Sequence, residues 1–238
     1  MASVSGILFD KDGTLFDFHA TWSAWAARLM RELAKGDDSH AARLGASVGY
    51  DLATGRFARD SVVIAGTPAE IAAELLPQLP GQTLAALVAR MNELAAAAPM
   101  AEAVPLQPLL QGLRRRGLRL GVATNDSEGP AKAHLGAVGV LSCFDFVAGS
   151  DSGFGGKPAP GMLLAFAARL GIAPGAVAMV GDSRHDLLAG RAAGMRTVAV
   201  LTGPAAEAEL APLADVVLPD IGHLPAWLDR AAVARNSA

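Results

Sequence analysis

Asp10 and Asp12 are the residues of this chain best placed to do chemistry, because they stand two positions apart directly after the apolar run Ile7–Phe9. Alternate side chains of a strand share one face, so the two carboxylates can converge just past the end of a strand. Two ionised carboxylates held that close must share a cation or a proton. Oxygen ligands of this kind suit Mg²⁺, so the pair indicates a metal site or acid–base chemistry, although the same residues alone could form a solvated turn.

Further polar groups follow three predicted strands downstream. Thr124 and Asn125 can offer a hydroxyl, an amide and backbone N–H groups to a phosphoryl oxygen. Lys157 precedes a proline that keeps it on a loop, where its charge can neutralise a carboxylate and a phosphate together. Asp182 and Asp186 lie four residues apart across a predicted strand-to-helix turn, so Asp182 can face a metal while Asp186 ligates it or orients its water shell. Each group alone could be a helix cap, a surface lysine or a helix N-terminal charge, but together at successive strand ends they indicate one site.

Short apolar runs alternate with helical stretches after about residue 114, which is typical of βαβ units around a parallel sheet. The chain is therefore predicted to have an α/β fold. The expected strands are Val4–Phe9, Leu118–Ala123, Phe144–Ala148, Val177–Val180, Thr197–Leu201 and Asp215–Leu218. The expected helices between them are Pro130–Val138, Pro160–Leu170 and His185–Ala193.

The stretch from residue 18 to residue 99 is rich in alanine and leucine and contains no convincing strand pattern. We interpret it as an all-helical cap domain inserted after the first strand, with residues 1–17 and 100–238 forming the core. Its expected helices are Ala20–Lys35, Ala41–Leu52, Pro68–Leu76 and Leu84–Ala97.

Composition and charge narrow the classes of partner. The 238 residues carry a formal net charge of −3 and contain no run of lysine and arginine, which argues against nucleic acid and anionic membranes as partners. Cys143 is the single cysteine, so no intrachain disulfide can form and a cytoplasmic location is expected. No apolar run approaches the length of a membrane span. A small molecule is the expected partner.

The four motifs together resemble those of the haloacid dehalogenase superfamily, in the phosphatase branch that carries a helical cap after the first strand. They are Asp-Lys-Asp-Gly-Thr-Leu at 10–15, Thr124-Asn125, Gly-Lys-Pro-Ala-Pro at 156–160 and Gly-Asp-Ser-Arg-His-Asp at 181–186. They occur in the family's order and span the whole chain. The resemblance implies a Rossmann-like core and a Mg²⁺-dependent phosphatase that acts on a small phosphoester.

The resemblance also implies a role for each matching residue. Asp10 would attack phosphorus and form an aspartyl-phosphate, and Asp12 would act as the general acid and base. Asp10, the backbone carbonyl of Asp12 and Asp182 would hold Mg²⁺, with Asp186 close by. The phosphoryl oxygens would be held by Gly13, Thr124, Asn125 and Lys157.

Several alternatives share these residue types. Dehalogenases and phosphonate hydrolases of the superfamily lack the second aspartate, which is present here as Asp12. A sugar phosphomutase shares the whole catalytic set and stays the main alternative. A non-catalytic phosphate-sensing regulator is less favoured, because receiver domains carry their acidic pair, hydroxyl and lysine in another order and a degenerate regulator would be expected to lose one of these aspartates. A monomer or homodimer is expected.

Phosphoglycolate is the first-choice substrate on the overall resemblance. Arg56 or Arg59 in the cap could then meet its carboxylate, although a solvated basic segment is the plainer interpretation. Trp22 and Trp25 are expected to pack in the cap core, and nearby His19 could face the cleft. Lys11 lies between the two aspartates and should point to the opposite face of the strand, outside the catalytic centre.

Overall fold

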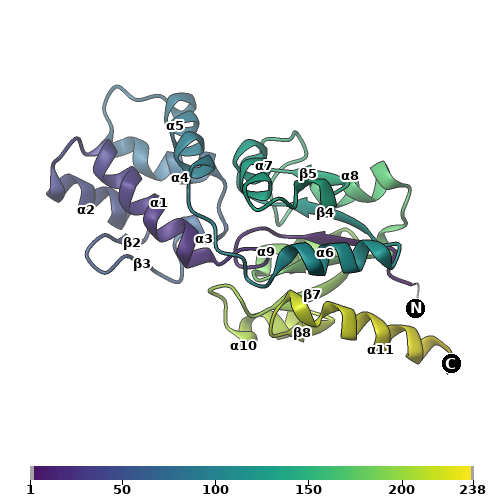
Figure 1. The fold of residues 1–238 in the computed structure, drawn as a ribbon. Helices are drawn as coiled ribbons and strands as arrows, with labels where there is room; N and C mark the ends of the chain where they lie inside the picture. Colours follow the sequence, from purple (N-terminus) through teal and green to yellow (C-terminus); the bar gives the residue numbers. More distant parts are fainter. Residues whose placement is uncertain (1–2, 237–238) are drawn as a thin grey trace.

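The computed structural model describes residues 3–236, which form a parallel sheet with helices on both faces and a smaller helical cap at one end (Figure 1). The α/β prediction is confirmed. The strand order is β5-β4-β1-β6-β7-β8, and all five pairings are parallel. The strands are β1 (Gly6–Phe9), β4 (Arg119–Ala123), β5 (Phe146–Ala148), β6 (Val177–Gly181), β7 (Arg196–Val200) and β8 (Val216–Leu218).

Helices cover both faces of the sheet because its strands are apolar on both sides. In β1, Ile7 and Phe9 pack into one hydrophobic cluster while Leu8 packs into another on the opposite face. The first face carries α6 (Leu106–Arg115), α7 (Glu128–Ala137) and α11 (Leu224–Asn236). The second face carries α8 (Gly161–Leu170), α9 (Arg184–Ala192) and α10 (Glu207–Leu210).

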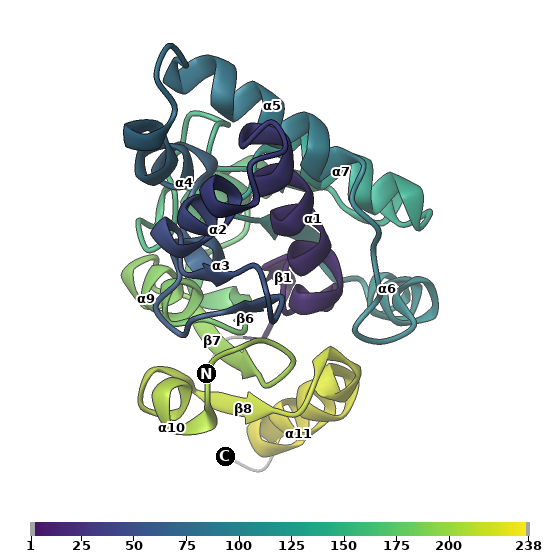
Figure 2. The ribbon, with the colours of Figure 1, turned by 90° about the vertical axis from the view of Figure 1, so that its left-hand side faces the viewer.

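The cap segment, residues 18–99, has a hydrophobic cluster of its own that includes Phe18, Trp25 and Leu94. This separate cluster supports the proposed division into core and cap. Figure 2 looks onto the cap, whose helices lie in front of the sheet. They are α1 (Phe18–Leu33), α2 (Asp38–Ser47), α3 (Val62–Ala65), α4 (Pro68–Leu75) and α5 (Leu84–Ala96).

The cap also contains a two-stranded antiparallel hairpin, so the expectation of a strand-free cap is wrong. Its strands β2 (Tyr50–Asp51) and β3 (Arg56–Phe57) are too short to show an alternating pattern. The hairpin replaces the end of the helix expected to reach Leu52. That helix stops at Ser47, because Gly49 adopts a φ of 71° that turns the chain out of the helix.

No helix in the described range 3–236 is long and apolar enough to cross a membrane. Cys143 is buried in the main hydrophobic cluster, as expected for a small core residue.

Candidate active site

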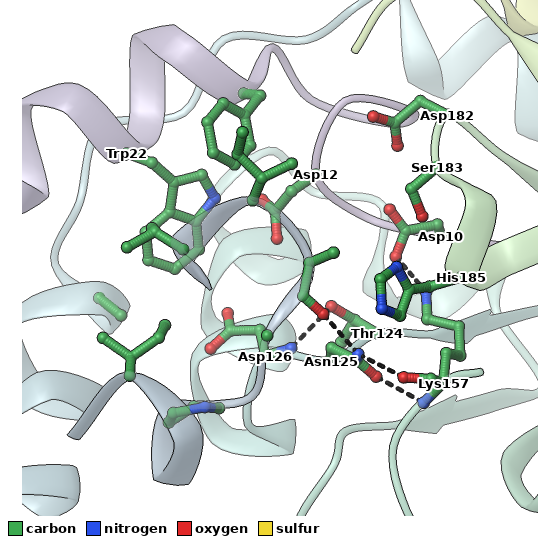
Figure 3. A pocket seen from close by; sticks show the side chains of 18 of the residues that line it. Asp10, Asp12, Trp22, Thr124, Asn125, Asp126, Lys157, Asp182, Ser183 and His185 are labelled. Carbon is green, nitrogen blue, oxygen red and sulfur yellow. Dashed lines mark hydrogen bonds and ion pairs between the residues drawn. The ribbon is translucent and has the colours of Figure 1, made fainter. Parts of the chain in front are cut away.

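Seven of the predicted site residues meet in one cavity between the carboxyl ends of the strands and the cap (Figure 3). Because β1, β4 and β6 are parallel neighbours, the residues that follow them emerge at the same edge of the sheet. The predicted residues that line this cavity are Asp10, Asp12, Thr124, Asn125, Lys157, Asp182 and Asp186.

Lys157 lies on the loop that follows β5 and binds Asp10, the candidate nucleophile. Its Nζ donates to Oδ1 of Asp10 at 2.6 Å, to Oδ1 of Asp186 at 2.6 Å and to the carbonyl of Ala123 at 2.8 Å. Burial alone would lower the pKa of this lysine, but the carboxylates of Asp10 and Asp186 outweigh burial and raise it above its usual value. Lys157 is therefore a fixed positive charge beside Asp10.

Asp10, Asp182 and Asp186 form a buried group of carboxylates in which one oxygen of each lies within 4.8 Å of the others. Burial raises the pKa of Asp10 to about 7 against the opposing effect of Lys157, and the nearby carboxylates of Asp186 and Asp12 add to the rise. The pKa of Asp182 is raised well above its usual value by burial and by Asp10 and Asp186. One lysine does not neutralise three buried carboxylates. An oxygen-only set with this excess negative charge fits a hard divalent cation such as Mg²⁺.

Asp182 is fixed closely against the loop that follows Asp12. Gly13 has a φ of 76°, and a Cβ at that position would overlap the Asp182 carboxylate. The hydroxyl of Thr14 donates to Oδ1 of Asp182 at 3.3 Å. Gly13 was predicted to contact phosphate, and the structure shows that its lack of a side chain also allows this close approach.

Asp186 both caps the N-terminus of α9 and binds Lys157. Its Oδ2 accepts from the backbone N–H and the hydroxyl of Ser183, at 3.0 and 2.6 Å, in a capping box at the start of α9. Its Oδ1 accepts from Lys157. The helix cap therefore orients a carboxylate that positions the lysine beside Asp10.

Thr124 and Asn125 differ in what they leave available for a ligand. The amide of Asn125 donates to the carbonyls of Ala65 and Lys157, at 2.7 and 2.9 Å, and accepts from the Lys157 N–H at 2.7 Å. Its side chain therefore joins the Lys157 loop to the cap with both amide N–H groups in use, and the expected contact between Asn125 and phosphate stays a prediction. The hydroxyl of Thr124 accepts from the N–H of Asp126 at 3.1 Å, which leaves its proton for a ligand oxygen.

Lys11 does not point away from the site, contrary to the expectation. Its fully buried Nζ lies 2.8 Å from both carboxylate oxygens of Asp12 and 3.2 Å from Oδ2 of Asp126. Burial would lower the pKa of Lys11, but these two carboxylates raise it above its usual value. Lys11 therefore fixes the orientation of the proposed acid–base residue.

His134 completes this network and links it to the cap. Its Nδ1 lies 3.0 Å from the Lys11 Nζ and its Nε2 lies 2.6 Å from the carbonyl of Ala95 at the end of α5. Burial and the nearby Lys11 lower the pKa of His134 to about 4, so the ring is neutral near pH 7. Since Lys11 can only donate, Nδ1 is the acceptor and Nε2 carries the proton that is donated to Ala95.

Replacing Lys11 with methionine is expected to destabilise the protein by about 3–5 kcal/mol, because Asp12 and Asp126 would lose their buried cation. Lys132→Met is the matched control, since Lys132 pairs with Glu128 in solvent and should cost less than about 1 kcal/mol. Urea unfolding of both variants measures the difference. Equal midpoints for the two variants would show that the Lys11 network adds nothing to stability.

The two predicted cap arginines lie outside the catalytic cavity. Arg56 is exposed on β3, and Arg59 lines a neighbouring cavity that shares Lys157 and His185 with the first. His19 is exposed and packs edge-on against Phe18. Trp22 and Trp25 pack in the cap cluster as expected and also line the catalytic cavity.

Sequence reasoning missed Asp126, Ser183 and His185, all of which line the cavity. Asp126 directly follows the Thr-Asn pair, and the other two lie inside the motif at 181–186. Their positions beside strand ends were the available signal. Burial raises the pKa of Asp126 to about 6 against the effect of Lys11, with Asp12 adding to the rise.

Comparison with known proteins agrees with this geometry. Residues 4–194 match the family model for haloacid dehalogenase-like hydrolases. The chain is 31% identical over 205 residues to Probable phosphatase IndB from Dickeya dadantii, which covers 83% of this chain and 81% of that relative. The chain belongs to the haloacid dehalogenase-like hydrolases.

More local matches and similar structures complete the comparison. A phosphoglycolate phosphatase from Rhodospirillum rubrum is 38% identical over 120 residues, which covers 50% of each chain. A crystal structure described as a predicted phosphoglycolate phosphatase from Haemophilus somnus has a TM-score of 0.72 at 18% identity, covering 94% of this chain and 97% of that one. A β-phosphoglucomutase from Clostridium difficile has a TM-score of 0.67 at 16% identity, covering 97% and 99%. These structures establish the fold, while the family and its phosphatase-named members support a phosphoric monoester hydrolase.

Proposed function

We propose that this protein is a Mg²⁺-dependent phosphatase that hydrolyses a small phosphorylated metabolite through an aspartyl-phosphate on Asp10. The observation that carries the proposal is the Asp10 carboxylate, which lies at the floor of the cavity with Oδ1 bound by Lys157. This contact leaves Oδ2 for attack on phosphorus. The family membership supports the same chemistry.

The reaction follows in two displacements. Oδ2 of Asp10 attacks phosphorus, the bond from phosphorus to the alcohol oxygen breaks, and Asp12 gives its proton to that oxygen. Asp12 then takes a proton from a water that attacks the aspartyl-phosphate, and inorganic phosphate leaves as Asp10 is regenerated. We propose that the Thr124 hydroxyl donates to a phosphoryl oxygen and that the positive charge of Lys157, held at Asp10, offsets the phosphoryl charge in both steps.

We assign the metal to Asp10, Asp182 and the Asp12 backbone carbonyl, with Asp186 ligating or orienting the water shell. The clustering of three buried carboxylates supports this assignment. Mg²⁺ bound there would supply positive charge to the phosphoryl oxygens and offset repulsion between Asp10 and the substrate. The Asp12 carboxylate lies outside the three-carboxylate group and contacts Lys11.

The comparisons favour two candidate activities, a phosphoglycolate phosphatase and a sugar phosphomutase. The phosphoglycolate phosphatases among the relatives support phosphoglycolate, although the alignments to them cover half of this chain or less. The fold shared with a β-phosphoglucomutase keeps a sugar phosphomutase as the alternative. A mutase returns the phosphoryl group to a sugar, whereas a phosphatase passes it to water.

A panel assay separates these possibilities. We expect phosphate release from a small set of phosphomonoesters with Mg²⁺, and at least about a hundredfold less with EDTA, because the carboxylates at the site would lose their neutralising cation. The same samples are assayed for isomerisation of β-glucose 1-phosphate. Isomerisation without phosphate release would identify a mutase, and release that persists unchanged in EDTA would overturn the proposed metal dependence.

A further inference from the structure

The cap side of the catalytic cavity is built from uncharged side chains. It includes the aromatic rings of Phe18, Trp22 and Trp25, together with Ile71 and Met91. Among the described cap residues that line the cavity, none is acidic or basic. Of these described cap residues lining the cavity, Asn92 is the single one with a side-chain amide.

The two tryptophans of this wall contact each other and the helix α5. The rings of Trp22 and Trp25 meet edge to face with centroids 5.0 Å apart, and the Trp25 indole N–H donates to the carbonyl of Met91 at 3.2 Å. The Trp22 ring lies beside Asp12 (Figure 3), and the Lys11 Nζ is 5.3 Å from the centroid of that ring. The leaving group that receives a proton from Asp12 therefore faces an aromatic surface.

Lys157 lines the cavity, Lys11 is fully buried against Asp12, and both lysines already bind carboxylates. Lys11 contacts Asp12 and Asp126, and Lys157 contacts Asp10 and Asp186. A second anionic group on the substrate would therefore enter an apolar space without a cation of its own. Burying an unpaired carboxylate costs several kcal/mol, whereas an apolar group gains free energy by leaving water.

We infer that the alcohol released at this site is uncharged and mainly apolar, with a place for one hydrogen-bonding group beside Asn92. The inference rests on the proposed phosphatase function and narrows its substrate class. It disfavours phosphoglycolate, whose alcohol carries a carboxylate. Among the described cap residues that line the catalytic cavity, no cation is available to bind that carboxylate.

The neighbouring cavity lined by Arg59 is the other place where a charged group of the substrate could bind. It contains Arg59 and Arg184, and it meets the catalytic cavity at Ile64 and His185. The acidic residues Asp60, Glu70 and Glu209 line the same space and offset the two arginines. A carboxylate that extended there would depend on Arg59 or Arg184, and this dependence is measurable.

The test compares kcat/KM for benzyl phosphate, ethyl phosphate and phosphoglycolate in the wild-type protein with Mg²⁺. All three release a primary alcohol, so their comparison reports mainly on binding of the alcohol portion. We expect kcat/KM for benzyl phosphate to exceed that for phosphoglycolate by at least about tenfold, with ethyl phosphate between them.

Ile64→Arg then adds the missing cation at a half-buried position of the cavity wall. We expect it to change the benzyl phosphate to phosphoglycolate ratio by at least about tenfold in favour of phosphoglycolate. Ala85→Arg is the matched control, because it adds the same charge at an exposed position of α5 away from the cavity. Its ratio should stay within about twofold of the wild-type value.

The outcomes separate the inference from the function on which it rests. Preferential hydrolysis of phosphoglycolate, lost in Arg59→Ala or in Arg184→Ala, would overturn the apolar substrate class while leaving the phosphatase intact. An equal response of the two arginine insertions would also overturn it. Failure to release phosphate from any of the three esters, or from the wider panel, would instead remove the proposed function itself.

Discussion

Asp10→Asn is expected to lower kcat by about 10⁴-fold or more while leaving the protein folded. The amide cannot accept the phosphoryl group, so the first displacement loses its nucleophile. The amide oxygen of this variant can still accept from Lys157, and loss of one charge relieves repulsion with Asp182 and Asp186. The measurements are phosphate release with the best substrate of the panel and urea unfolding.

Two further variants make this result interpretable. Asp37→Asn makes the same chemical change at an exposed N-cap of α2, where asparagine caps nearly as well, and its activity should be unchanged. Asp10→Ala excludes recovery of activity through deamidation of the introduced amide. Turnover of Asp10→Ala within about tenfold of the wild-type rate would eliminate Asp10 as the phosphoryl acceptor.

The catalytic floor could be predicted from the sequence because its geometry depends on local rules. Each residue follows a short apolar strand, and parallel strands bring their carboxyl ends to one edge of the sheet. Asp10, Lys157 and Asp182 therefore meet, although they lie far apart along the chain. The pairing of Lys157 with the Asp10 carboxylate was expected, whereas its second ion pair, with Asp186, was not, because that contact depends on how the Lys157 loop folds back.

Lys11 shows where the local rule fails. Strand alternation placed it on the face opposite Asp10 and Asp12, but β1 ends at Phe9. The chain then turns, with the N–H groups of Leu15 and Phe16 both donating to the Lys11 carbonyl. Once the strand has ended, the period of two no longer fixes direction, and the buried lysine turns towards Asp12 and Asp126.

The cap shows a second limit of sequence reasoning. The spacing of Trp22 and Trp25 correctly predicted that they pack in the cap core, yet helical periodicity cannot distinguish a face that fills this core from one that borders a ligand cavity. Arg56 and Arg59 were predicted to contact the substrate because of their charges, but neither lines the catalytic cavity. Their location follows from the β2–β3 hairpin, which had no clear sequence signal.

Lys157→Met is expected to lower kcat by at least about 10²–10³-fold, because Asp10 and the phosphoryl oxygens would lose the positive charge between them. It should also destabilise the fold by about 3–5 kcal/mol, since two buried carboxylates lose their common partner. Activity measurements and urea unfolding report the two effects separately.

The double variant Lys157→Met, Asp186→Asn, compared with Asp186→Asn alone, distinguishes a catalytic role for Lys157 from a structural one. Removing the charge of Asp186 eliminates one of the two uncompensated carboxylates, so part of the lost stability should return. The introduced amide can still accept from Ser183 at the start of α9. Activity should stay low, because neither substitution restores a cation beside Asp10. If activity instead rose in parallel with stability, Lys157 would act only by keeping the site folded, and charge neutralisation at phosphorus would have to come from another group.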